Sequence, residues 1–255
     1  MFRLRHTVIL SFMLLFFCAC EQSDNAIGGT GYLYHLRPCN FLNVNNAWLQ
    51  EFSYQDDKYD EHGLIIEPDL NEEEIVYNNY LIRICVNGVE RDYPFFLYPC
   101  RPAPDITALE LDPDPIMEQQ IKAFYENRPR TRSSGFALNV INIEYRNEAL
   151  EDLKVFATEN LYGKEPGDCL NDKVCVYGGP EPFYFDAGKN LIPIKGYPWG
   201  SLSDYMDFSP MTPAILYLQL NEKPQEVPVT LHFVVELKVE GKEPFRDTTR
   251  TITLR

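Results

Sequence analysis

Apolar residues recur at every second position along much of this chain. The longest run covers residues 229–239 and holds six of them in succession. A strand places every second side chain on the same side, whereas a helix would scatter these six around its circumference. A turn around Gly241 and Pro244 follows, and then a Thr-rich segment, residues 248–254. The C-terminal end therefore predicts two antiparallel strands.

The same alternation predicts strands elsewhere. Residues 80–87 end in Asn87-Gly88, a dipeptide typical of tight hairpin turns, so residues 89–96 are expected to return as the partner strand. Further strands are expected over residues 106–111, 139–146, 153–158 and 215–220. Strands joined by short polar connections favour antiparallel sheets.

Helical signals are confined to two places. Asp114 precedes a proline, and this pair is typical of a helix start, because the aspartate caps the first turn and proline fits the first helical position. Ser201 with Asp204 three residues later predicts one further helical turn. The apolar residues after the first cap share one face of the expected helix: Met117, Ile121 and Phe124.

These elements predict a mainly β chain, an antiparallel β-sandwich of the immunoglobulin-like type with long loops and one or two short helices. An acidic insertion, residues 56–74, is expected to be an exposed loop between strands. A proline cluster at residues 99–105 could mark a boundary between two subdomains. A single sandwich is favoured, because few strands precede the cluster.

The first twenty residues read as an export signal. Arg3 and Arg5 precede an apolar run, residues 8–17, that is too short to span a bilayer. Ala19-Cys20 then resembles a lipobox, so we expect cleavage before Cys20 and lipidation of its sulfur. The alternative is an ordinary secretory signal with Cys20 left as a plain thiol. The expected organisation is a signal peptide over residues 1–19, a flexible Gly-rich tether over residues 20–31 and an ectodomain over residues 32–255.

Charge narrows the choice of partners. The chain has 255 residues with 23 basic and 38 acidic side chains, a net charge of −15. Removal of residues 1–19 takes away two arginines and no acid, which leaves 21 basic side chains. Such an acidic surface repels phosphate backbones, so nucleic acid is not an expected partner. Anionic lipid is repelled too, and attachment to the membrane is therefore assigned to the N-terminal lipid anchor.

Five cysteines follow Cys20, and an exported protein can keep disulfides. Cys169 and Cys175 flank a short polar segment and are the first expected pair. Cys39 and Cys100 both lie beside prolines at expected strand ends, and pairing them would leave Cys85 free. Cys85 with Cys100 is the other option, and sequence leaves this connectivity open.

The sequence holds no pattern typical of an enzyme. The histidines after the signal lack zinc-ligand spacing, and neither a nucleophile elbow nor a dinucleotide fingerprint occurs. No catalytic residue and no cofactor are therefore predicted. Asp105, Asp112 and Asp114 cluster near a strand end and are a weak calcium candidate, since carboxylates suit Ca²⁺. Asp114 also has its expected role as a helix cap.

Aromatic residues offer a binding hypothesis. Tyr197, Trp199 and Tyr205 lie in a loop-rich region, and Trp48 lies in a second aromatic group. Exposed rings can stack on sugars or anchor a protein partner. The alternative is that these rings are buried and hold loops against the sandwich, which is the usual position of large aromatic residues.

Several segments beside the lipobox and tether resemble those of uncharacterised lipoproteins of Bacteroidota, of the domain-of-unknown-function type. They are Tyr-Pro-Cys-Arg-Pro-Ala-Pro-Asp-Ile (98–106), Leu-Gln-Leu-Asn-Glu-Lys-Pro (218–224) and Thr-Ile-Thr-Leu (251–254). The resemblance implies anchoring in the outer membrane by diacylglycerol and an amide-linked acyl chain, facing the periplasm or the exterior. It carries no functional residues. The expected function is a non-enzymatic binding or scaffolding role towards an envelope protein, with glycan binding as the alternative.

Overall fold

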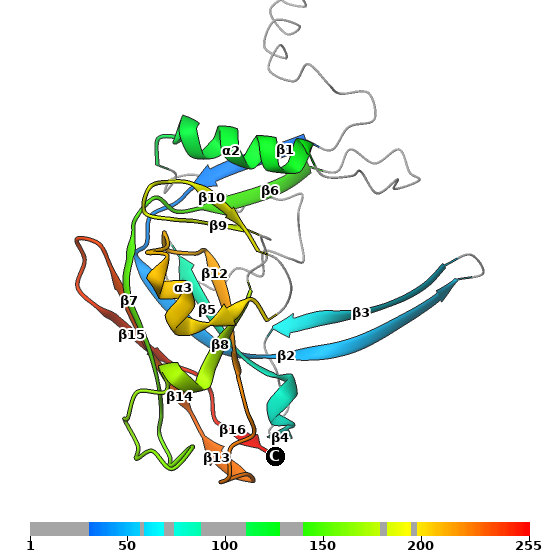
Figure 1. Cartoon of the computed structure of the whole chain (residues 1–255), viewed down its shortest axis with the longest axis vertical. Coiled ribbons are helices and arrows are strands. Elements are labelled where there is room, and N and C mark those ends of the chain that lie inside the picture. Colours follow the sequence, from blue (N-terminus) through cyan, green and yellow to red (C-terminus); the bar gives the residue numbers. More distant parts are fainter. Residues whose placement is uncertain are drawn as a thin grey trace, which may run out of the picture.

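The computed structural model describes residues 31–56, 59–68, 74–87, 111–127, 140–178, 183–194 and 198–255. The described chain is mainly β, as predicted, with several antiparallel sheets and two α-helices. Figure 1 shows a body of crossing strands, a helix above it and a long hairpin that leaves one side. None of the helices in the described ranges is both long enough and apolar enough to cross a membrane.

The largest sheet has six strands in the order β11-β8-β12-β5-β2-β3, and every neighbouring pair is antiparallel. In β5, Ile82, Ile84 and Val86 enter the main core while Leu81 enters a smaller cluster on the other face. The predicted alternation of this strand is therefore confirmed. The strands are β2 (Phe41–Asp56), β3 (Tyr59–Pro68), β5 (Tyr80–Asn87), β8 (Val174–Gly178), β11 (Gly200–Ser201) and β12 (Ile215–Leu220).

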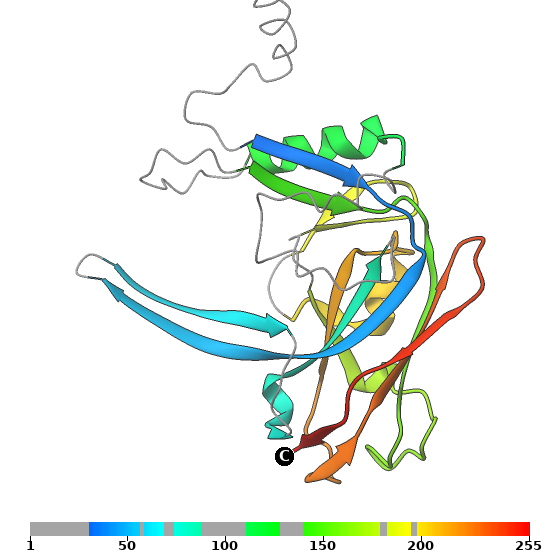
Figure 2. The same cartoon turned by 180° about the vertical axis from the view of Figure 1, so that it is seen from behind.

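A second layer closes the main core. β14 (Phe233–Val239) lies between β15 (Phe245–Thr248) and β7 (Leu150–Ala157), and both pairs are antiparallel. Alternate residues of β14 and β7 pack into the same core as those of β5 and β12. The ring of Tyr80 stacks on that of Phe233, with centroids 5.4 Å apart. Figure 2 shows this layer from behind.

The expected C-terminal strand is split in two at His232. β13 (Val229–Leu231) pairs with β16 (Ile252–Leu254), which also pairs in parallel with β4 (Glu74–Ile75), whereas β14 pairs with β15 and β7. At the crossing, Thr158 Oγ1 accepts a hydrogen bond from the His232 amide at 3.0 Å. The alternation was predicted correctly, but the residues of this one continuous pattern belong to two different sheets, through β13 and β14.

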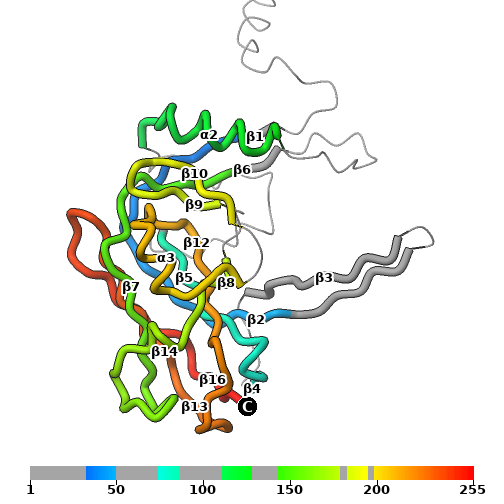
Figure 3. The backbone as a smooth tube through the Cα atoms, viewed as in Figure 1, coloured from blue at the N-terminus to red at the C-terminus, as the bar shows by residue number. Residues whose placement is uncertain are grey.

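A smaller unit lies above the main core. β1 (Gly31–Leu36) pairs in parallel with β6 (Val140–Tyr145), and β9 (Phe183–Phe185) pairs with β10 (Leu191–Pro193). β6 leads directly into β7, as the tube in Figure 3 shows. β9 belongs to both cores, because Phe183 and Phe185 pack into the upper cluster and Tyr184 into the main one.

Both predicted helices are confirmed with their caps. In α2 (Pro115–Glu126), the Asp114 side chain accepts hydrogen bonds from two backbone amides of the first turn, at 3.1 and 3.3 Å. Met117 and Ile121 are buried in the upper cluster. In α3 (Leu202–Asp207), the Ser201 hydroxyl accepts from the Asp204 amide at 3.0 Å. Short 3₁₀ turns cover Tyr77–Asn79 (η1) and Asn171–Lys173 (η3).

Arg146 and Glu148 lie in the connection between β6 and β7, and both bind neighbouring segments of the chain. The Glu148 carboxylate, between β6 and β7, accepts the Cys39 amide at 2.8 Å and the Lys242 ammonium at 2.6 Å. Lys242 also donates to the Cys39 carbonyl oxygen at 2.5 Å. Nearby, the fully buried Arg146 guanidinium donates to the carbonyl oxygens of Tyr145, at 3.2 Å, and Val86, and pairs with Glu144. Arg37 shares that carboxylate at 3.6 Å.

The acidic insertion was predicted wrongly as a loop. Most of it forms β3, which pairs with β2 over ten positions, from Ala47 with Pro68 to Asp56 with Tyr59. β2 continues past its last pair with β5, and β3 supplies partners for backbone groups that a loop would leave unpaired. The expected strand over residues 89–96, most of that over residues 106–111 and the proline cluster lie outside the described residues, as do residues 1–30.

The expected Cys169–Cys175 disulfide is absent, and this prediction was wrong. Both residues are free thiols. Cys169 is exposed and Cys175 is buried. Cys169 forms an isolated antiparallel β-bridge through its backbone with Phe156 of β7, whereas Cys175 lies within the six-stranded sheet opposite Gln219. The short segment between them therefore passes from one layer to the other, which keeps the two side chains apart. Cys39 is also a buried thiol, and its expected partner Cys100 lies outside the described residues.

Candidate functional site

The best-defined surface feature is the segment between β7 and β8, residues 158–173, which we call the β7–β8 loop. It opens with a tight turn in which Leu161 and Lys164 exchange backbone hydrogen bonds of 3.2 and 3.1 Å. The two central residues, Tyr162 and Gly163, have φ of 58° and 69°. Two consecutive positive φ values define a type I′ hairpin turn, which glycine adopts readily and tyrosine only with outside support.

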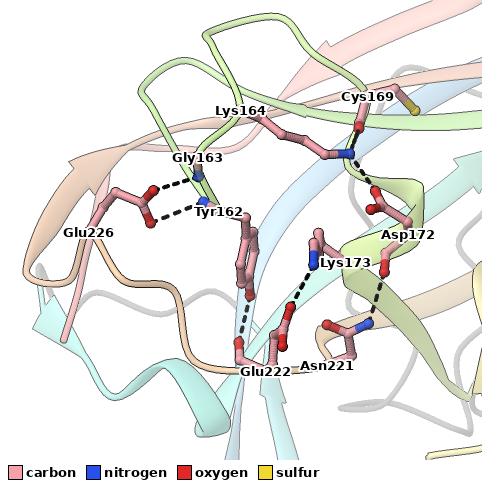
Figure 4. Close-up of polar contacts among 9 residues, drawn as sticks. All are labelled: Tyr162, Gly163, Lys164, Cys169, Asp172, Lys173, Asn221, Glu222 and Glu226. Carbon is pink, nitrogen blue, oxygen red and sulfur yellow. Dashed lines mark hydrogen bonds and ion pairs between the residues drawn. The ribbon is translucent and has the colours of Figure 1, made fainter.

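That support comes from Glu226. Its two carboxylate oxygens accept the amides of Tyr162, at 3.0 Å, and Gly163, at 2.7 Å (Figure 4). Consecutive amides in such a turn form a concave site for an anion. The Gly163 amide bond, reinforced by that of Tyr162, lowers the pKa of the Glu226 carboxyl. The turn is therefore fixed by a residue from the distant connection between β12 and β13.

Ion pairs fix the far side of the loop (Figure 4). Lys164 donates to the Cys169 carbonyl oxygen at 2.6 Å and to the Asp172 carboxylate at 2.5 Å. Lys173 pairs with Glu222 at 2.6 Å. The Lys164 contact lowers the pKa of Asp172. Two further bonds join the same segments: Tyr162 Oη to the Glu222 carbonyl oxygen at 2.6 Å, and Asn221 Nδ2 to the Asp172 carbonyl oxygen at 3.0 Å.

The loop is also fixed to the body of the protein. Asn171 accepts the Val155 amide at 3.0 Å and donates to the Leu153 carbonyl oxygen at 2.7 Å. Leu170 is buried in the main core. The loop thus presents a rigid surface, and Glu159, Glu165 and Asp168 are exposed on it. A preformed acidic surface suits recognition of a basic group better than chemistry on a substrate.

Glu226 allows a direct test of this rigidity. We expect Glu226→Ala to speed hydrogen exchange of the Tyr162 and Gly163 amides about tenfold, because each loses a bond to a charged acceptor. Since the folded pKa of Glu226 lies below its ordinary value of 4.5, the contribution is complete above pH 4.5 and is lost as pH falls through the lowered pKa. The measurement is the Gly163 amide shift against pH by NMR. Glu226→Gln should abolish the titration, and an unchanged curve would contradict the assignment.

A second candidate region is a cluster of four aromatic rings, which we call the aromatic cluster. It comprises Tyr184 of β9, Trp199 before β11, Tyr205 of α3 and Phe208 at the end of α3. Each of Tyr184 and Trp199 contacts the other three rings, edge to face, with centroids 5.4–5.9 Å apart. Tyr184 and Tyr205 are buried, Trp199 is half-buried, and Phe208 is 48% exposed. The rings therefore form a stepped surface with Phe208 outermost.

The hydroxyls of Tyr184 and Tyr205 are buried, and neither has a hydrogen-bond partner among the described residues. Burial raises the pKa of Tyr184 to about 12, with a further contribution from Asp186. Burial also raises the pKa of Tyr205, and Tyr184 adds to this effect.

The structure brings together only part of the predicted aromatic site. Trp199 and Tyr205 are in contact, but Tyr205 is buried and Trp199 only half-exposed, so neither is the exposed platform that stacking on a sugar was expected to use. Trp48 lies on β2 and packs against the main core. Tyr197 lies outside the described residues.

The predicted carboxylate cluster is engaged elsewhere. Asp114 caps α2 and pairs with Lys189 at 2.5 Å. Burial opposes this charge, but the Lys189 contact outweighs it and lowers the pKa of Asp114. Asp112 is exposed, and Asp105 lies outside the described residues. Over the described ranges, no three His, Cys, Asp or Glu side chains gather as metal ligands would.

Sequence reasoning missed the β7–β8 loop. Tyr162-Gly163 carries a turn signal, but nothing in the chain links it to Glu226. Tyr184 and Phe208 were not among the predicted binding residues. Comparison of the chain with protein-family models, with curated proteins and with solved structures gives no match.

Proposed function

We propose that this chain is a lipid-anchored protein of the outer membrane with a non-enzymatic binding or scaffolding role. Its export signal and Cys20 support the anchor, and β1 begins at Gly31, the last residue of the Gly-rich tether. The body would then stand away from the membrane on that tether, facing the periplasm or the exterior. An immunoglobulin-like arrangement of its two layers is part of this proposal.

The observation that carries the binding role is the rigid β7–β8 loop. Long surface loops positioned by a rigid body often carry binding residues. Here both flanks are fixed, by Glu226 on one side and by Asp172 and Glu222 on the other. A surface ordered in advance loses little conformational entropy on binding. Its exposed acids favour a protein partner that presents lysine or arginine.

Glycan binding is the second candidate. It is supported by the aromatic cluster, where Phe208 is 48% exposed beside the half-buried Trp199. The exposed ring of Phe208, with Trp199 beside it, can cover the apolar face of a sugar.

The lipid anchor is tested by metabolic labelling with a fatty-acid probe in cells that express the wild type or Cys20→Ala. We expect label on the wild type alone, and release of the variant into the soluble fraction. Equal labelling of both would refute the anchor.

The binding surface is tested by photo-crosslinking in the same cells. A photoreactive residue at Glu165, on the loop, is expected to capture a discrete envelope protein. The same residue at Glu243, in the exposed turn at the other end of β14, is the matched control and should capture none. Adding Glu226→Ala should weaken capture at position 165 severalfold, because the loop is no longer held. Equal capture at both positions, or none at position 165, would overturn the proposed role of this loop.

A further inference from the structure

The buried hydroxyls of the aromatic cluster need an explanation. Tyr184 and Tyr205 are 6% and 2% exposed, and their oxygen atoms have no partner within the described parts of the chain. Buried tyrosine hydroxyls nearly always have a hydrogen-bond partner, because a buried unsatisfied hydroxyl destabilises the fold. Phenylalanine would fill the same space without this cost. Two such hydroxyls in contacting rings are therefore available to a polar group of a ligand.

The position of the cluster indicates how that group arrives. Phe208 contacts Tyr184 and Trp199, and it is the most exposed of the four rings. It follows the last turn of α3, and Ser209 after it has a φ of 48°, in the left-handed region. Phe208 is therefore the ring of the cluster that a ligand would meet first, with the half-buried Trp199 beside it.

We propose that the aromatic cluster is a binding site for a neutral, hydroxyl-rich ring such as a saccharide unit, with the hydroxyls of Tyr184 and Tyr205 as its hydrogen-bonding floor. A phenolic hydroxyl both donates and accepts, which matches the hydroxyls of a sugar. The rings of Trp199 and Phe208 match the apolar face of the same ligand. The inference deepens the glycan-binding candidate above and does not depend on the β7–β8 loop.

Charge around the cluster favours a neutral ligand over an anionic one. Asp204 and Asp207 are exposed on α3, which carries Tyr205, and no basic residue occurs in that helix. Asp186 follows β9, and its carboxylate is bonded by Asn190 at 2.8 Å from the backbone amide and at 3.0 and 3.1 Å from the side chain. Uronic acids and sulfated sugars would be repelled by these carboxylates.

Calorimetric titration of the full chain in detergent tests the proposal, with a panel of neutral hexose and N-acetylhexosamine oligosaccharides as probes. We expect binding of at least one neutral probe, with the affinity lowered about tenfold in Tyr184→Phe and in Tyr205→Phe, since each loses one ligand hydrogen bond. Tyr162→Phe is the matched control, because its hydroxyl bonds the Glu222 carbonyl oxygen in the β7–β8 loop. That variant should bind as the wild type does.

Thermal unfolding of the same variants without sugar separates folding from binding. Both substitutions keep the ring, so the fold should persist, and a bound sugar should raise Tm less in the variants than in the wild type. Absence of binding across the neutral panel, or equal affinity in wild type and both variants, would overturn the proposal. Binding of acidic sugars alone would also overturn it. Crosslinking at Glu165 is an independent result, so failure here would leave the protein-binding role standing.

Discussion

Replacement of Arg146 by alanine is expected to lower the free energy of unfolding by about 3–5 kcal/mol, because it breaks a buried charge pair and leaves its partners behind. The Arg146 side chain is fully buried. Its guanidinium bonds the carbonyl oxygens of Val86 and Tyr145 and pairs with Glu144. In the variant, Glu144 would lose Arg146 and keep its contact with Arg37, at 3.6 Å, and the Val86 carbonyl oxygen would lose this donor. The site joins β5 of the six-stranded sheet to the end of β6 in the upper unit, so both should be weakened.

Urea unfolding followed by circular dichroism measures the loss. Arg146→Met keeps much of the volume without the charge, and it should remain well below wild-type stability because Glu144 stays unpaired by its main partner. Lys238→Ala is the matched control, since its ion pair with Glu151, at 2.7 Å, is exposed. That control should unfold close to the wild-type midpoint. A stability for Arg146→Ala within about 1 kcal/mol of wild type would contradict the role assigned to the guanidinium.

Glu148→Ala is expected to cost about 2–3 kcal/mol, because one carboxylate satisfies both the buried Cys39 amide and Lys242. The residue holds the corner between β1 and β2 against the turn between β14 and β15. Loss of the carboxylate would leave the Cys39 amide without an acceptor. In the wild type, burial and then the hydrogen bond with Glu148 raise the pKa of the Cys39 thiol to about 12. Glu148→Gln should cost less, since the amide oxygen can still accept from Cys39.

The pH dependence of the stability gives a second test of the role of Glu148. Burial raises its pKa, but the hydrogen bonds from Cys39 and Lys242 outweigh burial, and the pKa falls below the ordinary value of 4.5. Its contribution is therefore complete above pH 4.5 and is lost as pH falls through the lowered pKa. Wild type and Glu148→Gln should converge in stability as the pH is lowered. A constant difference at all pH values would contradict the assignment.

Local features of the fold were predictable, and distant pairings were not. The limits of β12 and the capped start of α2 followed from alternation and from Asp114, which depend on near neighbours. The parallel pairing of β1 with β6 did not, because the two strands lie about a hundred positions apart and carry no signal of each other. The break at His232 was hidden for the same reason, since the alternation continues while the partner strands change.

The candidate sites show the same division. The Tyr162-Gly163 turn has a local signal, but the carboxylate that holds it lies 64 and 63 positions away. The expected Cys169–Cys175 bond failed because proximity in sequence says nothing about which layer each residue joins. Trp199 and Tyr205 were predicted as binding residues from the sequence, but only the packed structure separates Phe208 at the surface from Tyr205 inside.

β9 is a short strand, but its position affects how cooperatively the protein unfolds. Its alternate side chains pack into two separate hydrophobic clusters. Unfolding of either cluster would therefore displace β9 and expose part of the other to solvent. The helix-bearing upper unit and the lower two-layer body are thereby coupled, and heating should disrupt them in one cooperative step. Three consecutive residues thus contact both the cluster that holds α2 and the rings around α3.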